Sequence, residues 1–144
     1  MAHQTPGSKT HFALFIGVGT YIVTLGFLYL ILINGWPTVN MEKMNGTASA
    51  YVVVWVAWFS MFFLAIQGFF ALMHPPQKSG AIWIDIGGVL ALFAVLVVAL
   101  TRTANFTLFQ WVVFYIFAPA ILIDLFVNLP LSYRIATRTF EVAS

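Results

Sequence analysis

The segment 106–129, FTLFQWVVFYIFAPAILIDLFVNL, constrains the fold more than any other part of the chain. It is long enough to cross a bilayer as an α-helix, for which about 20 apolar residues suffice. It also contains Gln110, Asp124 and Asn128, which helical spacing places on one face. A carboxylate inside a membrane must face protein or water and not lipid. We therefore expect this face to point inward, where other helices cover it.

Composition places the whole chain in the membrane class. Hydrophobic residues make up 62% of the sequence and charged residues 7%, whereas a soluble domain has about 25% charged residues. The net charge of +2 comes from scattered basic residues, so the sequence gives no basic patch for a nucleic-acid partner. Cysteine is absent, which excludes disulfides and thiolate metal sites.

Four apolar segments are long enough to span a bilayer, at about 11–33, 50–73, 81–101 and 106–129. We expect a single integral membrane domain over 1–144, an all-α membrane protein built as an antiparallel four-transmembrane-helix bundle. The polar and small residues recur at spacings of three and four, which predicts left-handed packing.

The same spacing identifies the expected inward face of the other three spans. On the third span two stripes run side by side, and the small residues of the first suit close helix approach. The stripe of the first span is Ala13, Gly17, Thr20, Thr24, Phe27 and Ile31, and that of the second is Ala57, Ser60, Leu64, Gln67, Ala71 and His74. On the third span the small-residue stripe is Gly87, Ala91 and Ala94, and the stripe alongside it is Asp85, Gly88, Leu92, Val95 and Ala99.

Asp85 and Asp124 are the most informative pair of polar residues. They lie on adjacent antiparallel spans, each about 6–8 Å from the same membrane surface at 1.5 Å per residue. One interpretation is a proton relay or cation site. The other is structural, with each carboxylate accepting hydrogen bonds or pairing with Lys78, His74 or Arg134.

Other polar residues have a structural and a functional interpretation. His74, together with His11 at the same boundary, could ligate a haem, a chlorophyll-type pigment or a metal ion, or could be an interfacial histidine. Gln67 and Gln110 are expected to tie helices together by amide hydrogen bonds. We expect no metal site.

Aromatic residues make up 17% of the chain, and we expect many of them to cover outward faces. These faces suit lipid contact, another membrane subunit, or flat cofactors such as quinone, carotenoid or chlorophyll-type pigment. On the second span alone they are Phe59, Phe62, Phe63, Phe69 and Phe70.

The loop charges predict the orientation. Four spans put both termini on one side, with Lys9, Lys78, Arg134 and Arg138, against Lys43 and Arg102 on the other. The excess of basic residues favours the cytoplasm for both termini, and we expect a multi-pass protein of the bacterial inner membrane.

The sequence lacks a nucleophile elbow, a phosphate-binding glycine loop, an HExxH pattern and a dinucleotide fingerprint, so we expect no enzyme. The first functional hypothesis is a non-catalytic accessory subunit of an energy-converting complex for electron transport, of respiratory, photosynthetic or oxidase type, with other membrane subunits and lipids as partners. The second is a small homo-oligomeric proton- or cation-coupled transporter or channel that uses Asp85 and Asp124. The third is a pigment- or quinone-binding membrane subunit.

Overall fold

The computed structural model describes residues 6–73, 79–131, 133–134 and 137–138. Side chains are described for 15–69, 83–131, 133–134 and 137–138. The described part is helical and has no strand. The main helices are α1 (Pro6–Leu28), α2 (Gly46–Met73), α3 (Ser79–Leu100) and α4 (Leu108–Ile123). Short π-helical segments, η1 (Tyr29–Ile33) and η4 (Asp124–Asn128), continue α1 and α4, and 3-10 turns η2 (Met41–Lys43) and η3 (Thr103–Asn105) lie in the connections.

The structure confirms the prediction of an all-helical chain with four span-length apolar helices. By length and composition, Phe15–Ile33, Gly46–Phe69, Trp83–Leu100 and Leu108–Leu131 could each cross a membrane. Together they indicate an integral membrane protein.

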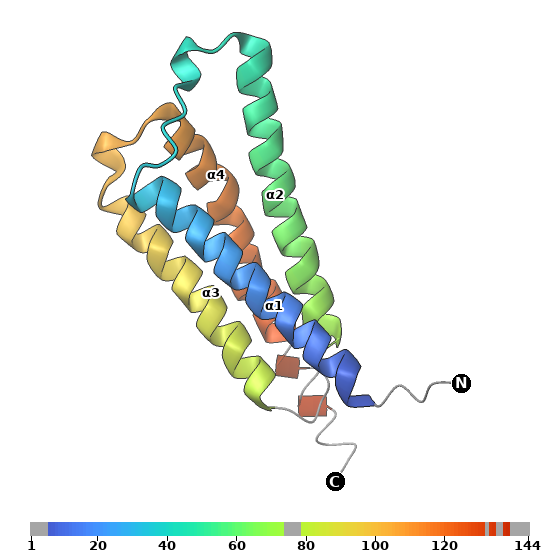
Figure 1. Ribbon diagram of the computed structural model, residues 1–144. Coiled ribbons are helices and arrows are strands. Elements are labelled where there is room, and N and C mark those ends of the chain that lie inside the picture. Colours follow the sequence, from blue (N-terminus) through green and yellow to red (C-terminus); the bar gives the residue numbers. More distant parts are fainter. Residues whose placement is uncertain (1–5, 74–78, 132, 135–136, 139–144) are drawn as a thin grey trace.

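The four helices lie side by side, and consecutive helices run in opposite directions (Figure 1). The N-terminal end of α1, the C-terminal end of α2 and the start of α3 lie at one end of the molecule, which we call the terminal end. At the other end, α2 reaches beyond its neighbours (Figure 1). All four helices contribute to one apolar core, which includes Leu28, Phe63, Leu92 and Phe117.

The inward face of α1 differs in part from the predicted stripe. Thr24 is buried as expected, but Tyr21 and Leu28 are buried in place of Thr20 and Phe27, which are half-buried. Both stripes pass through Thr24 at helical spacing, so the pattern alone could not separate them. The stripe with Tyr21 prevails because it gives the phenol hydroxyl partners inside the protein.

On α3, the stripe that contains Asp85 faces inward, and the small-residue stripe faces outward. Gly87 and Ala94 are exposed, whereas Leu92 and Ala99 are fully buried. The helix rotates its polar stripe inward because Asp85 needs hydrogen-bond donors that lipid cannot supply.

Three phenylalanine rings from three helices meet in the middle of the core. The ring centroids of Phe27 and Phe59 lie 4.8 Å apart, those of Phe27 and Phe117 5.5 Å, and those of Phe59 and Phe117 5.8 Å. We call these three residues the phenylalanine triad. It joins α1, α2 and α4 through ring packing. The expectation that Phe59 and Phe63 cover an outward face is wrong, because Phe63 is buried and Phe59 half-buried in this core.

Candidate functional site

A tyrosine and two aspartates from three helical segments meet at the centre of the polar site. The Tyr21 hydroxyl of α1 donates to Asp85 Oδ1 of α3 at 2.6 Å, and it lies 3.1 Å from Asp124 Oδ2 of η4. The three residues are only 6%, 4% and 2% exposed, respectively. We call them the acidic cluster. They bring two carboxyl groups within hydrogen-bonding distance of one oxygen, away from solvent.

Asp124 is held by a second contact. Asn128 Nδ2, one turn further along η4, donates to Asp124 Oδ1 at 2.9 Å. Both carboxyl oxygens of Asp124 therefore have a described partner. This arrangement fixes the plane of the carboxyl group and directs Oδ2 toward Tyr21.

Gly88 makes the cluster possible by leaving room for the Tyr21 ring. A Cβ atom built on Gly88 would lie 2.5 Å from Tyr21 Cγ, closer than real Cβ contacts. The ring thus packs directly on the α3 backbone, one turn from Asp85. The edge of the Phe63 ring of α2 contacts the tyrosine ring as well, with centroids 6.1 Å apart.

The hydrogen count at the cluster has a chemical consequence. A phenol has one hydrogen to donate, and an ionised carboxylate has none. The Tyr21 hydroxyl has one hydrogen, which it donates to Asp85. A second hydrogen bond, across the contact with Asp124, forms when that carboxyl group carries a proton and donates it to the phenol oxygen. The geometry thus suits a site that binds one exchangeable proton.

More polar side chains are buried close to the cluster. Thr24 lies one turn from Tyr21 on α1, and Ser60 and Gln67 lie on the buried face of α2. Within the described part of the chain, Thr24 Oγ1 and both amide atoms of Gln67 have no hydrogen-bond partner. The prediction that Gln67 ties two helices together by a hydrogen bond is therefore not met among these residues.

Gln110 lies at the opposite end of the molecule. Its Nε2 donates to the Ile31 carbonyl at 2.8 Å, and its Oε1 accepts from the Thr107 backbone at 2.8 Å. The Thr107 side chain in turn accepts from the Gln110 backbone, which completes a capping box at the start of α4. Gln110 thus links α4 to η1, and it is not part of the acidic cluster.

The hollows lined by described residues include two outside the cluster, one beside Gln110 and one between α1 and α2. A cavity of about 370 Å³ lies beside Gln110 and includes Gly35, Asn40, Phe106 and Thr107. An apolar groove of about 250 Å³ runs between α1 and α2. Its lining includes Phe15, Gly19, Val23, Phe59 and Phe62, a chemistry suited to an acyl chain.

The structure brings Asp85 and Asp124 together, as their depth and their adjacent helices led us to expect. Arg134, one of the cations expected near them, is exposed. His74 and Lys78 lie outside the described residues, and the side chain of His11 does too. The described residues contain no group of three or more metal-binding side chains.

Tyr21 is the cluster residue that sequence reasoning missed. A signal was present, because Gly17, Tyr21 and Thr24 follow the same spacing of four and three as the stripe chosen for α1. The signal is weak, because a tyrosine in an apolar span is amphipathic and such residues are also common at membrane interfaces.

The chain was also compared with known proteins. No protein-family model matches it, and no curated protein and no solved structure does so either.

Proposed function

We propose that this protein is a small proton- or cation-coupled membrane transporter in which the acidic cluster binds and releases the coupling proton. The observation that supports this most is the position of the Tyr21 hydroxyl between Asp85 and Asp124. Ionisable groups inside a membrane protein are costly and typically mark ion or proton pathways.

A proton suits the cluster better than a metal cation. Hard divalent cations such as Mg²⁺ and Ca²⁺ take a shell of about six to eight oxygen ligands. Here one phenol oxygen occupies the space between the carboxyl groups, and Asn128 directs its amide nitrogen at Asp124. Neutralisation by a proton needs no such shell, because the proton sits within an existing hydrogen bond.

The membrane arrangement forms part of the proposal. The four helices cross the bacterial inner membrane as an antiparallel, left-handed bundle with both termini in the cytoplasm. The distribution of Lys9, Lys78, Arg134 and Arg138 against Lys43 and Arg102 supports this orientation. The acidic cluster then lies in the cytoplasmic half of the membrane.

Infrared spectroscopy of the purified protein tests proton binding directly. A protonated carboxylic acid has a carbonyl band that an ionised carboxylate lacks, and we call it the COOH band. We expect a COOH band that pH titration removes and that Asp124→Asn or Asp85→Asn abolishes. Glu42→Gln is the control, since Glu42 is exposed in η2. A wild-type protein with no titrating COOH band, or a band insensitive to both aspartate variants, contradicts the proposal.

Proteoliposomes then test coupling. A pH dye trapped inside reports proton movement when candidate solutes are added outside. We expect solute-dependent proton flux in the wild-type protein and none in Asp124→Asn. The asparagine side chain keeps the size of aspartate but does not ionise, so it cannot bind and release the coupling proton.

A second function, an accessory subunit of a larger membrane complex, has its own support. Trp55, Trp58, Phe62 and Phe69 of α2 are 74%, 67%, 63% and 63% exposed. Aromatic residues of this kind are enriched where proteins meet. Gentle extraction from native membranes, a native gel and mass spectrometry of the band test it. Co-migration with redox or pigment subunits supports it, and a small homo-oligomer contradicts it.

A further inference from the structure

Gln67 is an unusual residue for the interior of a membrane protein. Its side chain is 1% exposed, and neither Oε1 nor Nε2 has a hydrogen-bond partner among the described residues. Burying an amide without hydrogen-bond partners is unfavourable, because the group loses its bonds to water. Such a group in a folded protein calls for a polar occupant beside it.

Contacts along α2 place Gln67 at the level of the acidic cluster. Phe63, one turn earlier on the same buried face, packs its ring against Tyr21. The neighbouring Gly68 lies beside η4, since a Cβ built on it would be 3.9 Å from Asn128 Oδ1. Gln67 therefore lies between the levels of Tyr21 and Asn128, on the helix that contributes nothing to the cluster itself.

Water is the occupant that matches this amide. A buried water makes about two to four hydrogen bonds to otherwise unsatisfied polar groups. The amide of Gln67 offers both donors and an acceptor, at the level of the acidic cluster. A chain of such waters transfers protons by exchanging hydrogen bonds, whereas the apolar side chains around it do not.

The phenylalanine triad lies on the side of the acidic cluster that faces away from the terminal end. Along α1 and α2, Phe27 and Phe59 follow Tyr21 and Phe63 away from the terminal end. Phe117 completes the ring contact and has no exposed surface. A layer of packed rings offers water no hydrogen bonds, and such constrictions exclude it.

We infer that Gln67 holds water that links the acidic cluster to the aqueous phase at the terminal end only, with the phenylalanine triad as the barrier on the other side. The inference rests on the proposed function, because it supplies the path of the proton that the cluster binds. Gln67 is a positioning residue in this scheme, since it holds water and does not itself accept the transported proton.

Cysteine labelling tests the path in the intact protein. The chain contains no cysteine, so single-cysteine variants need no altered background. The probe is a small, charged, membrane-impermeant methanethiosulfonate, which reacts with thiolates in water. Val56→Cys is the matched control, because Val56 shares the buried face of α2 but lies beyond the triad. We expect Gln67→Cys in proteoliposomes to react about ten times faster than Val56→Cys or more, and only from the side of the termini. Equal rates, or reaction from the opposite side, overturn the inference.

A second variant covers the case in which Gln67→Cys does not fold. Gln67→Leu keeps the approximate volume and removes both polar atoms. We expect the COOH band to persist, but its shift on transfer to D2O to slow by about tenfold because the water-mediated contact is lost. Unchanged exchange kinetics in Gln67→Leu overturn the inference.

These measurements separate the two proposals. If the wild-type protein shows no titrating COOH band, the proposed function fails whatever the labelling shows. If the band titrates and depends on Asp124, but Gln67→Cys is not labelled and Gln67→Leu exchanges at the wild-type rate, the cluster binds a proton that arrives by another path.

Discussion

The ring of Tyr21 occupies the space that a side chain at Gly88 would need. A Cβ atom on Gly88 would lie 2.5 to 2.7 Å from three atoms of the tyrosine ring. The absence of a side chain at one position of α3 thus sets where the hydroxyl of an α1 residue lies, and with it the geometry of the acidic cluster.

Gly88→Ala is therefore expected to destabilise the protein by about 1–3 kcal/mol, as overpacking in a core does. It should also weaken the COOH band by displacing the Tyr21 hydroxyl. Thermal unfolding in detergent, followed by circular dichroism, measures the first effect. Gly87→Ala is the control: nothing lies within 4 Å of its built Cβ, so it should be neutral or stabilise by up to about 1 kcal/mol. Equal effects of the two substitutions would contradict the packing argument.

Tyr21→Phe removes the hydroxyl and keeps the ring. We expect a loss of about 1–3 kcal/mol, since carboxyl groups lose a buried donor. In a double-mutant cycle, Tyr21→Phe and Asp124→Asn should show a coupling energy above about 0.5 kcal/mol. Tyr29→Phe serves as the control, because Tyr29 is 53% exposed. Additive effects in the cycle would show that the 3.1 Å contact contributes nothing.

The start of α4 depends on Thr107 and Gln110. Thr107→Ala should cost about 1 kcal/mol, as the loss of an N-cap does. Gln110→Leu should cost more, because it also removes the 2.8 Å bond to the Ile31 carbonyl. Neither substitution should change the COOH band, since both residues lie far along α4 from Asp124. Thr38→Ala, at an exposed loop position, controls for the loss of a threonine, and the unfolding midpoint is the measurement.

Phe117→Ala tests the phenylalanine triad. Phe117 is fully buried, and removing a buried ring costs about 3–5 kcal/mol. The variant should also let the methanethiosulfonate reach Val56→Cys from the terminal end. Phe126→Ala is the control, since Phe126 is 69% exposed and its removal should change neither stability nor labelling. A Val56→Cys rate unaffected by Phe117→Ala would show that another layer is the barrier.

The sequence was sufficient for the four apolar helices and for the shared level of the two aspartates in the fold. A long apolar run forms a helix in lipid, because a helix pairs every backbone group within the segment itself. The rotation of α1 and α3 was harder to predict. A heptad stripe and its neighbour differ by a fraction of a turn, and the choice between Thr20 and Tyr21 depends on which partner faces it across the core.

The start of α4 was missed by two residues for a local reason. Thr107 and Gln110 match the pattern of a capping box, but the apolar run begins earlier, at Phe106, and hydropathy does not detect caps. The link between Tyr21 and Gly88 could not be predicted either, since it joins residues on different helices whose register only the packed structure defines.

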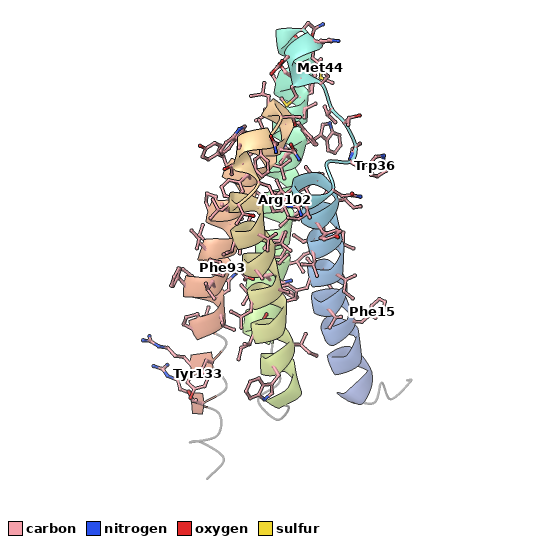
Figure 2. All side chains as sticks on the ribbon, turned by 90° about the vertical axis from the view of Figure 1, so that its left-hand side faces the viewer. Phe15, Trp36, Met44, Phe93, Arg102 and Tyr133 are labelled. Carbon is pink, nitrogen blue, oxygen red and sulfur yellow. The ribbon has the colours of Figure 1, made fainter. Side chains whose placement is uncertain are left out.

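The acidic cluster has one mechanical consequence. Its hydrogen bonds join α1, α3 and η4, while between Gly46 and Phe69 no described side chain of α2 makes a hydrogen bond to another helix. Figure 2 shows Phe15 and Trp36 projecting outward from the first helix and its connection, where they are 76% and 63% exposed. Packed helices without such bonds can slide over small distances in shear motions. In the described part of the molecule, hydrogen bonds thus join three helices, and α2, which holds Gln67, packs against them through apolar side chains.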